Sequence, residues 1–487
     1  MKTTTKFTIL NVASLVLAAF FSFGAAQAQG IVTRTITGKV TVGKKPLAGV
    51  PVTDGINFVT TDARGCYRIV TLADSRFVYI TTPSGYDVPT ERGTVPQFYK
   101  TLNATDSVYN FSLTRAKKSD KRHSFLVFAD VQATYEGDYE QFNRDIIPDV
   151  KATIADYGKR GVKLFGTDVG DFIGGIPQTY MQVYATACET IDLPFYRTIG
   201  NHDMDCEGRS YETSFHTFEQ FFGPVNHSMN CGNAHYVFLN NNFFAGIGIN
   251  YIGYLPEQTL RWLEQDLALV PKDKVIFIFM HIATGRSANL EEARFSTDWL
   301  NNARHLFEIV KDRTTHIITG HTHSQLNNEY SDRLYEHNTA AVCGTWWRCE
   351  ECMDGTPRGY AVFDVDGTDV RWRYKCAGYD SNYQMRVYAP GSCEECPDDV
   401  VANVWNYDSR WHVELLENGT VTAQMTQFTG YDPISKAHCL DKSVVLYDWI
   451  SPVPNGHMFR AKPTIAGSKR EVRVTDRFGN IYISEVK

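Results

Sequence analysis

Three segments, HSFLVFADVQ (123–132), KLFGTDVGDF (163–172) and FYRTIGNHD (195–203), decide the fold. Each contains a short apolar run and leads into Asp, Asn, Gln or His side chains. Two later segments, VIFIFMH (275–281) and THIITGHTH (315–323), repeat this arrangement. Because strand ends converge on one edge of a sheet, we expect the polar side chains of these segments to form one site there.

Helical periodicity fills the intervals between these apolar runs. Apolar residues recur at helical spacing around residues 146–157, 178–190, 260–267 and 299–310. This alternation of strands with helices predicts an α/β layered domain, which we place at residues 123–350.

Both flanks of this domain have the period-two alternation of β-strands. Residues 31–116 consist of short alternating runs separated by Gly, Pro and Asp, which predicts a β-sandwich. Residues 351–487 alternate in the same way, with turn signals such as Asn418-Gly419, and no helical pattern is expected after Gly359. We therefore expect an α/β protein flanked by an N-terminal β-sandwich and a C-terminal β domain.

Residues 1–28 predict export. Lys2 and Lys6 accompany an apolar run, and Ala26-Gln27-Ala28 has the small-x-small pattern that a signal peptidase cuts. No later run approaches the roughly 20 apolar residues of a membrane span. The mature protein is expected in the periplasm, on the cell surface or in the medium. The net charge of −7 disfavours nucleic acid as a partner.

Eleven cysteines fit an oxidising compartment. Cys349 with Cys352, and Cys393 with Cys396, form two CxxC pairs. Such pairs can hold a structural zinc ion or form disulfides, including disulfides that cross between the pairs. Disulfides are the favoured reading in an exported protein, and zinc is the alternative.

Gly-Asn-His-Asp at 200–203 and Gly-His-x-His at 320–323, with His281 between them, are the most specific signals of the chain. In this order they resemble the calcineurin-like metallophosphoesterases over residues 123–350. The run GKVTVGKKPLAGVPVTDG (38–55) is similar to the carboxypeptidase-regulatory-like and transthyretin-like β modules. The resemblance implies a central αββα sandwich with a binuclear metal centre at one edge.

The family pattern carries over to individual residues. Seven match metal ligands: Asp130, Gln132 and His323 for one ion, Asn201, His281 and His321 for the other, and Asp168 as the carboxylate that bridges both. His202 matches the general acid that protonates the leaving oxygen, and Asp171 matches the carboxylate that orients this histidine. In such a centre a metal-bridging hydroxide attacks phosphorus.

Two positions depart from the family pattern. The first motif is Asp-x-Gln, as in a subset of the family, instead of Asp-x-His; a neutral Gln132 oxygen favours Mn²⁺, Mg²⁺ or Fe over Zn²⁺. The second motif is usually Gly-Asp and reads Thr167-Asp168, where a residue other than Gly restricts the backbone. Two divalent ions, Mn, Fe, Mg or Zn, are the expected cofactors.

The resemblance implies a metal-dependent phosphoric ester hydrolase that acts on mono- or diesters. Its substrates would be phosphorylated small molecules, glycans or lipid head groups. The alternative is a non-catalytic envelope or glycan-binding protein on the same scaffold. In that case the departures at Gln132 and Thr167 would have weakened the central domain as a catalyst. Trp346 and Trp347 follow the last metal motif and either line the substrate cleft or pack against the last domain.

Overall fold

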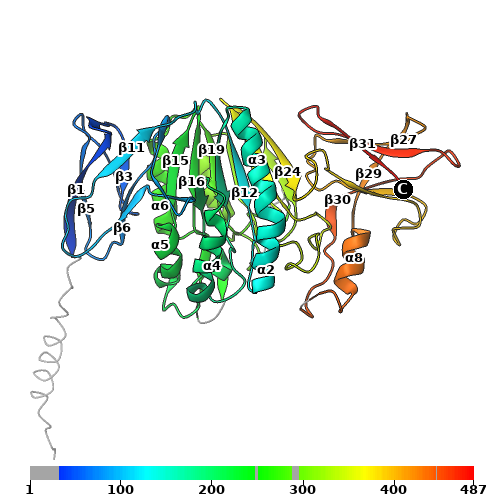
Figure 1. The fold of residues 1–487 in the computed structure, drawn as a ribbon, viewed down its shortest axis with the longest axis horizontal. Coiled ribbons are helices and arrows are strands. Elements are labelled where there is room, and N and C mark those ends of the chain that lie inside the picture. The colour runs from blue at the N-terminus through cyan, green and yellow to red at the C-terminus, as the bar shows by residue number, and fades with distance from the viewer. Residues whose placement is uncertain (1–31, 247–249, 288–294, 446) are drawn as a thin grey trace, which may run out of the picture.

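A computed structural model describes residues 32–246, 250–287, 295–445 and 447–487. The predicted signal peptide, residues 1–28, lies outside the described residues. The N-terminal β module, the central layered domain and the C-terminal β part follow one another along the long axis of the molecule, so the two β parts lie at opposite ends (Figure 1). Within the described residues, no helix combines the length and apolarity needed to cross a membrane.

The first central sheet has the strand order β14-β13-β12-β23-β24. Its strands are β14 (Phe195–Arg197), β13 (Lys163–Asp168), β12 (Arg122–Phe128), β23 (Gly359–Asp366) and β24 (Asp369–Cys376). Strand β12 pairs in parallel with β13 and antiparallel with β23. Phe125 and Val127 face one side of the sheet and Leu126 and Phe128 the other, and all four are buried, which explains the continuous apolar run.

The second central sheet has the strand order β15-β16-β19-β20-β22-β21. Its strands are β15 (His227–Cys231), β16 (Ala234–Phe238), β19 (Val275–Phe279), β20 (Thr315–Thr319), β22 (Leu334–Asn338) and β21 (Leu326–Ser331). Strands β16, β19, β20 and β22 are parallel neighbours. The five apolar runs expected to be strands are therefore confirmed as β12, β13, β14, β19 and β20.

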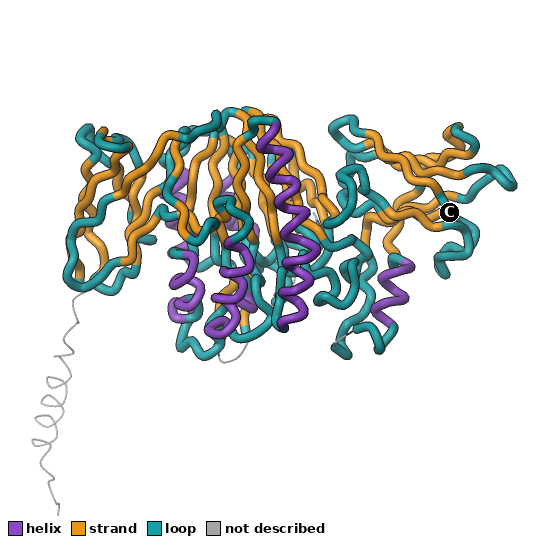
Figure 2. The backbone as a smooth tube through the Cα atoms, viewed as in Figure 1, coloured by secondary structure: helices purple, strands orange, loops and turns teal. Residues whose placement is uncertain are grey.

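Aromatic rings join the two sheets into a sandwich. Phe125 of the first sheet stacks on Phe363 and meets Tyr236, Phe277 and Phe279 of the second sheet edge-on. Helices cover the outer faces, as the purple and orange layers of Figure 2 show. The described helices of this part are α2 (Glu136–Gln141), α3 (Ile147–Lys159), α4 (Pro177–Glu189), α5 (His216–Phe222), α6 (Glu257–Ala268) and α7 (Ala303–Val310). This is the expected αββα arrangement.

Shorter elements complete the central part. A π-helical segment, η1 (Phe142–Ile146), joins α2 to α3, and two 3-10 turns, η2 (Asn201–Asp203) and η3 (Tyr211–Thr213), follow β14. Strands β17 (Asn242–Phe244) and β18 (Tyr251–Gly253) form a separate hairpin. Turn η2 carries two of the predicted site residues.

The N-terminal module is built from short strands, as predicted. One sheet contains β1 (Thr33–Val42), β2 (Lys45–Pro46), β5 (Cys66–Leu72), β7 (Tyr86–Asp87) and β11 (Phe111–Arg115). The other contains β3 (Pro51–Thr53), β4 (Phe58–Thr60), β6 (Phe77–Ile80) and β10 (Tyr99–Thr101), and β8 (Thr90–Glu91) pairs with β9 (Val95–Pro96). Phe58 packs on Trp262 of α6, so the module is attached to the central domain through a buried aromatic contact.

The C-terminal part consists mainly of β-strands. One sheet contains β25 (Arg386–Tyr388), β26 (Val400–Asn403), β30 (Asn455–Ala461) and β29 (Thr426–Gly430); the other contains β28 (Thr420–Gln424), β27 (His412–Glu417), β31 (Arg470–Thr475) and β32 (Ile481–Glu485). Two expectations differ here. The hairpin β23–β24 belongs to the central sheet although its sequence was grouped with the last domain. A helix, α8 (Pro433–Leu440), also lies after Gly359, where none was expected.

Candidate metal centre

Asp130 and Gln132 follow β12 and present buried oxygens that lack hydrogen-bond partners. Asp130 Oδ2 accepts a hydrogen bond from the main-chain N–H of His321 at 2.9 Å, whereas Asp130 Oδ1 has no donor and lies 3.4 Å from Nε2 of His323. Gln132 Nε2 donates to Asp171 Oδ2 at 3.0 Å, and Gln132 Oε1 has no donor. Since buried oxygens without partners are costly, these two atoms fit the ligands of a cation.

A second group of ligand atoms surrounds Nε2 of His281. This nitrogen lies 3.0 Å from Oδ1 of Asn201, 3.2 Å from Nδ1 of His321 and 3.2 Å from Oδ2 of Asp171. The other nitrogen of His281, Nδ1, lies 2.9 Å from the carbonyl oxygen of Val169, which fixes the ring by a main-chain contact. The ligand atoms of Asp171, His281 and His321 all lie within 4.8 Å of one another, so one ion could contact all three.

The charges in this group depend on one another. Burial would raise the pKa of Asp171, but His281 and His202 outweigh it and hold that pKa well below its usual value. Burial would lower the pKa of His281, yet Asp171 raises it to about 9. Burial and His281 lower the pKa of His321 to about 3. A divalent cation would displace the proton on His281, because ligand imidazoles must be deprotonated.

Three glycines bring the loops together. A Cβ on Gly170 would lie 2.5 Å from the nitrogen of Gly200, and a Cβ on Gly200 would lie 2.1 Å from Oδ1 of Asp171. A Cβ on Gly320 would lie 2.7 Å from Oδ2 of Asp130. Each glycine directly precedes a site residue, so the close approach of the loops requires residues without side chains at these positions.

Left-handed backbone conformations also mark the site. The φ angles are 52° at Asp130, 40° at Gln132, 56° at Asp171, 72° at His321 and 51° at His323. Non-glycine residues rarely adopt such angles, and each costs about 1 kcal/mol or more. This concentration of strained residues is typical of a functional site whose surroundings hold it in place.

Asp168, the predicted bridging carboxylate, makes its hydrogen bonds away from the histidines of the site. Its Oδ2 accepts a hydrogen bond from Tyr184 at 2.5 Å and its Oδ1 accepts from the N–H of Gly170 at 3.2 Å. Burial raises the pKa of Asp168 to about 7, against the effect of Tyr184 and Arg197. The geometry therefore turns this carboxylate toward the helix α4 side, while Asp171 faces the histidines.

Asp171 also contacts His202, but through the backbone. Its Oδ1 accepts a hydrogen bond from the main-chain N–H of His202 at 2.8 Å. The half-buried side chain of His202 lies on turn η2, directly after Asn201. Asp171 thus positions the turn that carries His202, which differs from the expected orientation of the imidazole.

Asp203 is a buried site residue for which no role was predicted. Its carboxylate accepts hydrogen bonds from the main-chain N–H groups of Asp171, Phe172 and Gly200 at 2.8, 3.0 and 2.8 Å. It therefore ties the loop after β13 to the loop after β14. In the sequence, the only indication that Asp203 belongs to the site is its position as the last residue of the Gly-Asn-His-Asp motif.

His323 and the two tryptophans have distinct environments. Nδ1 of His323 lies 3.9 Å from Sγ of Cys343, and its ring stacks on Trp346 with centroids 4.4 Å apart. Trp347 is buried, and its indole N–H donates to the carbonyl of Val131 at 2.8 Å. Trp347 packs in the core of the central domain. Trp346 lies on His323 and also packs against Tyr447 and Trp449 of the C-terminal part, so packing against the last domain is confirmed for this residue.

The cysteine pairs do not converge. Cys393 and Cys396 lie in the C-terminal part with their sulfur atoms 3.0 Å apart. Cys352 packs in the core of the central domain, whereas Cys349 lies near Glu351 and His438. Among the described residues the four thiols therefore do not form the shared zinc site considered above.

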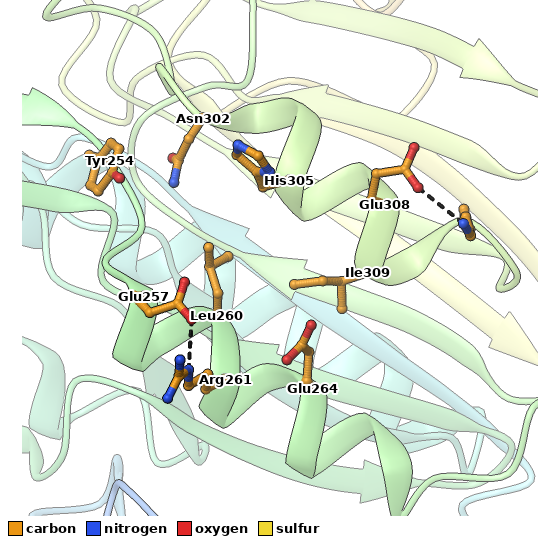
Figure 3. A pocket seen from close by; sticks show the side chains of 10 residues that line it. Tyr254, Glu257, Leu260, Arg261, Glu264, Asn302, His305, Glu308 and Ile309 are labelled. Atoms are coloured by element: carbon orange, nitrogen blue, oxygen red, sulfur yellow. Dashed lines mark hydrogen bonds and ion pairs between the residues drawn. The ribbon is translucent and has the colours of Figure 1, made fainter.

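A groove of about 450 Å³ between α6 and α7 contains none of the predicted site residues (Figure 3). Its charged lining is largely paired, because Arg261 contacts Glu257 at 2.6 Å and Lys311 contacts Glu308 at 3.1 Å. We assign it no part in the metal centre.

Comparisons with known proteins identify related families. Models for the N terminal of calcineurin-like phosphoesterase, calcineurin-like phosphoesterase, and the C terminal of calcineurin-like phosphoesterase match residues 34–116, 123–325 and 336–482. No curated protein matches the chain.

Several solved structures are similar over part of the chain. A dimetal phosphatase from Danio rerio is 13% identical, with 52% of this chain and 95% of that chain covered and a TM-score of 0.36. A purple acid phosphatase from yellow lupin (Lupinus luteus) seeds is 11% identical, with 67% of each chain covered and a TM-score of 0.37. A calcineurin-like phosphoesterase from Bacillus subtilis is 16% identical, with 52% and 90% covered and a TM-score of 0.30.

Proposed function

Because the chain belongs to the calcineurin-like phosphoesterase family, we propose that it is an exported hydrolase of phosphate mono- or diesters with a binuclear metal centre. The family consists of metal-dependent phosphoester hydrolases, and the chain is one of them. Two buried oxygens without donors, Asp130 Oδ1 and Gln132 Oε1, are the observation that carries the proposal for this centre.

We assign the metal ligands by the surroundings of each side chain. One ion would be held by Asp130, Gln132 and His323, the other by Asn201, His281 and His321, with Asp171 between them. This moves the bridging role from Asp168 to Asp171. Gln132 offers a neutral oxygen, so Mn²⁺, Mg²⁺ or Fe is favoured over Zn²⁺.

When bound, the ions would polarise the phosphoryl oxygens and lower the pKa of water. His202 is half-buried on turn η2, after β14, and we assign it the role of giving a proton to the leaving oxygen of a bound ester. Asp171 and Asp203 hold the η2 turn through main-chain N–H groups and so fix the position of His202.

The substrates we propose are phosphorylated small molecules, including sugars, glycan fragments and lipid head groups. The net charge of −7 disfavours long polyanions. Export rests on the signal-like residues 1–28, which place the enzyme in the periplasm, on the surface or in the medium.

Metal analysis with hydrolysis assays tests the function. Purified protein should contain about two equivalents of divalent metal. It should hydrolyse p-nitrophenyl phosphate or bis-p-nitrophenyl phosphate with added Mn²⁺, and a chelator should abolish this activity. Protein without bound metal that hydrolyses neither ester would favour the alternative of a glycan-binding scaffold.

Export has a separate test. The full chain should yield a mature protein that begins at Gln29 when expressed in a bacterial host. A chain that begins with Met followed directly by Gln29 should stay in the cytoplasmic fraction. An uncleaved full-length protein in the cytoplasm would contradict export without affecting the assignment of the metal centre.

A further inference from the structure

Four aromatic residues, Tyr135, Trp346, Tyr447 and Trp449, form an aromatic corner next to the metal centre. Trp346 stacks on His323 with centroids 4.4 Å apart and planes 21° apart. Trp449 meets Trp346 edge-on, with centroids 4.6 Å apart and planes 89° apart. Tyr447 stacks on Trp449 at 5.4 Å. The ring contacts run from the proposed metal ligand His323 to Trp346 and then to Trp449, so Trp346 lies between His323 and Trp449.

The corner combines segments that are far apart in the sequence. Tyr135 precedes α2, Trp346 follows β22, and Tyr447 and Trp449 follow α8. Helices α2 and α8 both lie toward the lower side of the molecule in Figure 1. The C-terminal part thus contributes rings to the surroundings of a centre whose ligands all come from the central domain.

Trp449 and Tyr135 remain accessible to solvent, whereas Trp346 and Tyr447 are half-buried. Trp449 is 59% exposed and Tyr135 is 51% exposed, whereas neighbouring Trp347 is only 3% exposed. Trp346 adopts a left-handed backbone angle, φ 45°, which places its ring on His323. Large exposed aromatic rings near a site are typical of ligand contacts, because solvent exposure of apolar surface is unfavourable unless a ligand covers it.

We propose that the aromatic corner binds the organic group of the substrate and selects phosphate esters that carry a flat ring. This inference rests on the proposed phosphoesterase function. The phosphate would lie at the metal centre and the ring on Trp449. Exposed Asp448 and Arg348 carry opposite charges, which cancel. These two residues therefore do not make the corner select a charged organic group. Stacking of the substrate ring on the aromatic faces is the interaction that would select the organic group.

Two monoesters whose leaving alcohols have similar acidity test the proposal. Benzyl phosphate carries a flat ring and methyl phosphate does not, and released phosphate is measured for both. We expect the wild-type kcat/KM to be about tenfold higher for the benzyl ester, the size of one aromatic stacking contact. In Trp449→Ala this preference should fall to about twofold, while kcat/KM for the methyl ester stays within about twofold of the wild type. Trp449→Phe should keep the preference.

Controls separate this inference from the function on which it rests. Tyr379→Ala removes another partly exposed ring, which stacks on Tyr383, and should leave the preference unchanged. Quenching of tryptophan fluorescence by phenyl phosphate, compared with methyl phosphate, reports binding to the metal-loaded protein without turnover. If the protein hydrolyses no ester but phenyl phosphate quenches its fluorescence more than methyl phosphate does, the proposed function is wrong and the inference about the aromatic corner stands.

The opposite pattern would overturn the inference. The inference is wrong if the wild type hydrolyses benzyl and methyl phosphate alike and phenyl and methyl phosphate quench equally, or if Trp449→Ala lowers kcat/KM for both monoesters by the same factor. Quenching by glucose 1-phosphate in the same assay distinguishes a sugar ring from an aryl ring as the preferred group: stronger quenching by the sugar phosphate than by phenyl phosphate would assign a sugar.

Discussion

Asp168 and Asp171 are both buried carboxylates, but their partners differ. Asp168 contacts Tyr184 and the main-chain N–H of Gly170, whereas Asp171 contacts Gln132, His281 and the main-chain N–H of His202. A carboxylate that bridges two ions must face both sets of ligands. Only Asp171 contacts residues from each set, so the two positions make opposite predictions for metal binding.

Substitution by Asn separates the two roles. Asp171→Asn should lose most bound metal and activity, because the bridging charge is removed. Asp168→Asn should keep about two metal equivalents and lose about 1–3 kcal/mol of unfolding free energy, since its amide cannot accept both existing hydrogen bonds. Elemental analysis and urea denaturation measure these outcomes. Metal loss in Asp168→Asn with full occupancy in Asp171→Asn would restore the original assignment.

His202 gives a prediction of a different kind, because it is assigned to proton transfer and not to metal binding. His202→Asn should retain its metal and lower kcat by about 10²–10⁴-fold for esters with poor leaving groups. The loss should be smaller for p-nitrophenyl esters, whose leaving oxygen needs little protonation. Equal losses of metal and rate would show that His202 is a ligand.

At the residue scale, the sequence predicts which side chains converge but not all of their roles. Asp130, Gln132, Asn201, His281, His321 and His323 each follow a strand and meet at one edge, as expected. The roles of Asp168 and Asp171 depend on which way each carboxylate turns at the end of β13 and in the loop that follows it. The glycine directly before Asp171 was the available signal, because close approach of Gly200 requires it.

At the element scale, an ion pair between half-buried Arg76 and buried Glu219 joins the N-terminal module to α5. Nε of Arg76 lies 2.6 Å from Oε2 of Glu219, and the Arg76 guanidinium also lies 5.2 Å from the ring of Phe215. Burial raises the pKa of Glu219 to about 7, although Arg76 opposes this effect. Asp205 adds negative charge nearby, and His216 of the same helix contacts Arg76.

The raised pKa of Glu219 predicts a pH-dependent stability. The folded protein holds the proton more tightly than the unfolded chain, so this contribution is complete below about pH 4.5 and is lost as the pH rises through about 7. Between pH 5 and pH 8 the wild type should lose about 1–3 kcal/mol relative to Glu219→Gln. Urea denaturation across this range measures the difference, and exposed Glu257→Gln is the control. Parallel curves for wild type and Glu219→Gln would contradict the prediction.

Element types were predicted best where both faces of a strand are buried. Strands β12 and β19 read as continuous apolar runs because sheets or helices cover both sides. Strand β24 alternates between buried and more exposed residues like a strand of a surface sheet, and the pairing of β23 with β12 shows that the hairpin extends the central sheet. Helix α8 is short, and its signal was local: Asp432 caps it and Pro433 begins it.

At the scale of the whole molecule, Asp354 links the C-terminal part to the loop after β20, which carries His321 and His323. Its Oδ2 accepts a hydrogen bond from the main-chain N–H of Gln325 at 2.8 Å and lies 3.2 Å from Nε2 of His457. Its main-chain carbonyl accepts from Asn403 and Asn455 of the C-terminal sheet. Gln325 is two residues from His323, so this buried carboxylate is one of the contacts that join the C-terminal part to the loop of a proposed metal ligand, together with the hydrogen bonds of Gln325 and Asn327 to Asn406.

Removal of this carboxylate should therefore affect both parts at once. Asp354→Ala leaves the Gln325 N–H and His457 without their acceptor in a fully buried place, which should cost about 2–5 kcal/mol of unfolding free energy and weaken metal binding. Asp354→Asn keeps one acceptor oxygen and should lose less. Limited proteolysis should release a C-terminal fragment faster from Asp354→Ala than from the wild type. Asp398→Ala, which removes an exposed partner of Lys462, is the matched control and should change neither property. If Asp354→Ala unfolds and binds metal like the control, other contacts, such as those of Gln325 and Asn327 with Asn406, hold the C-terminal part against the central domain.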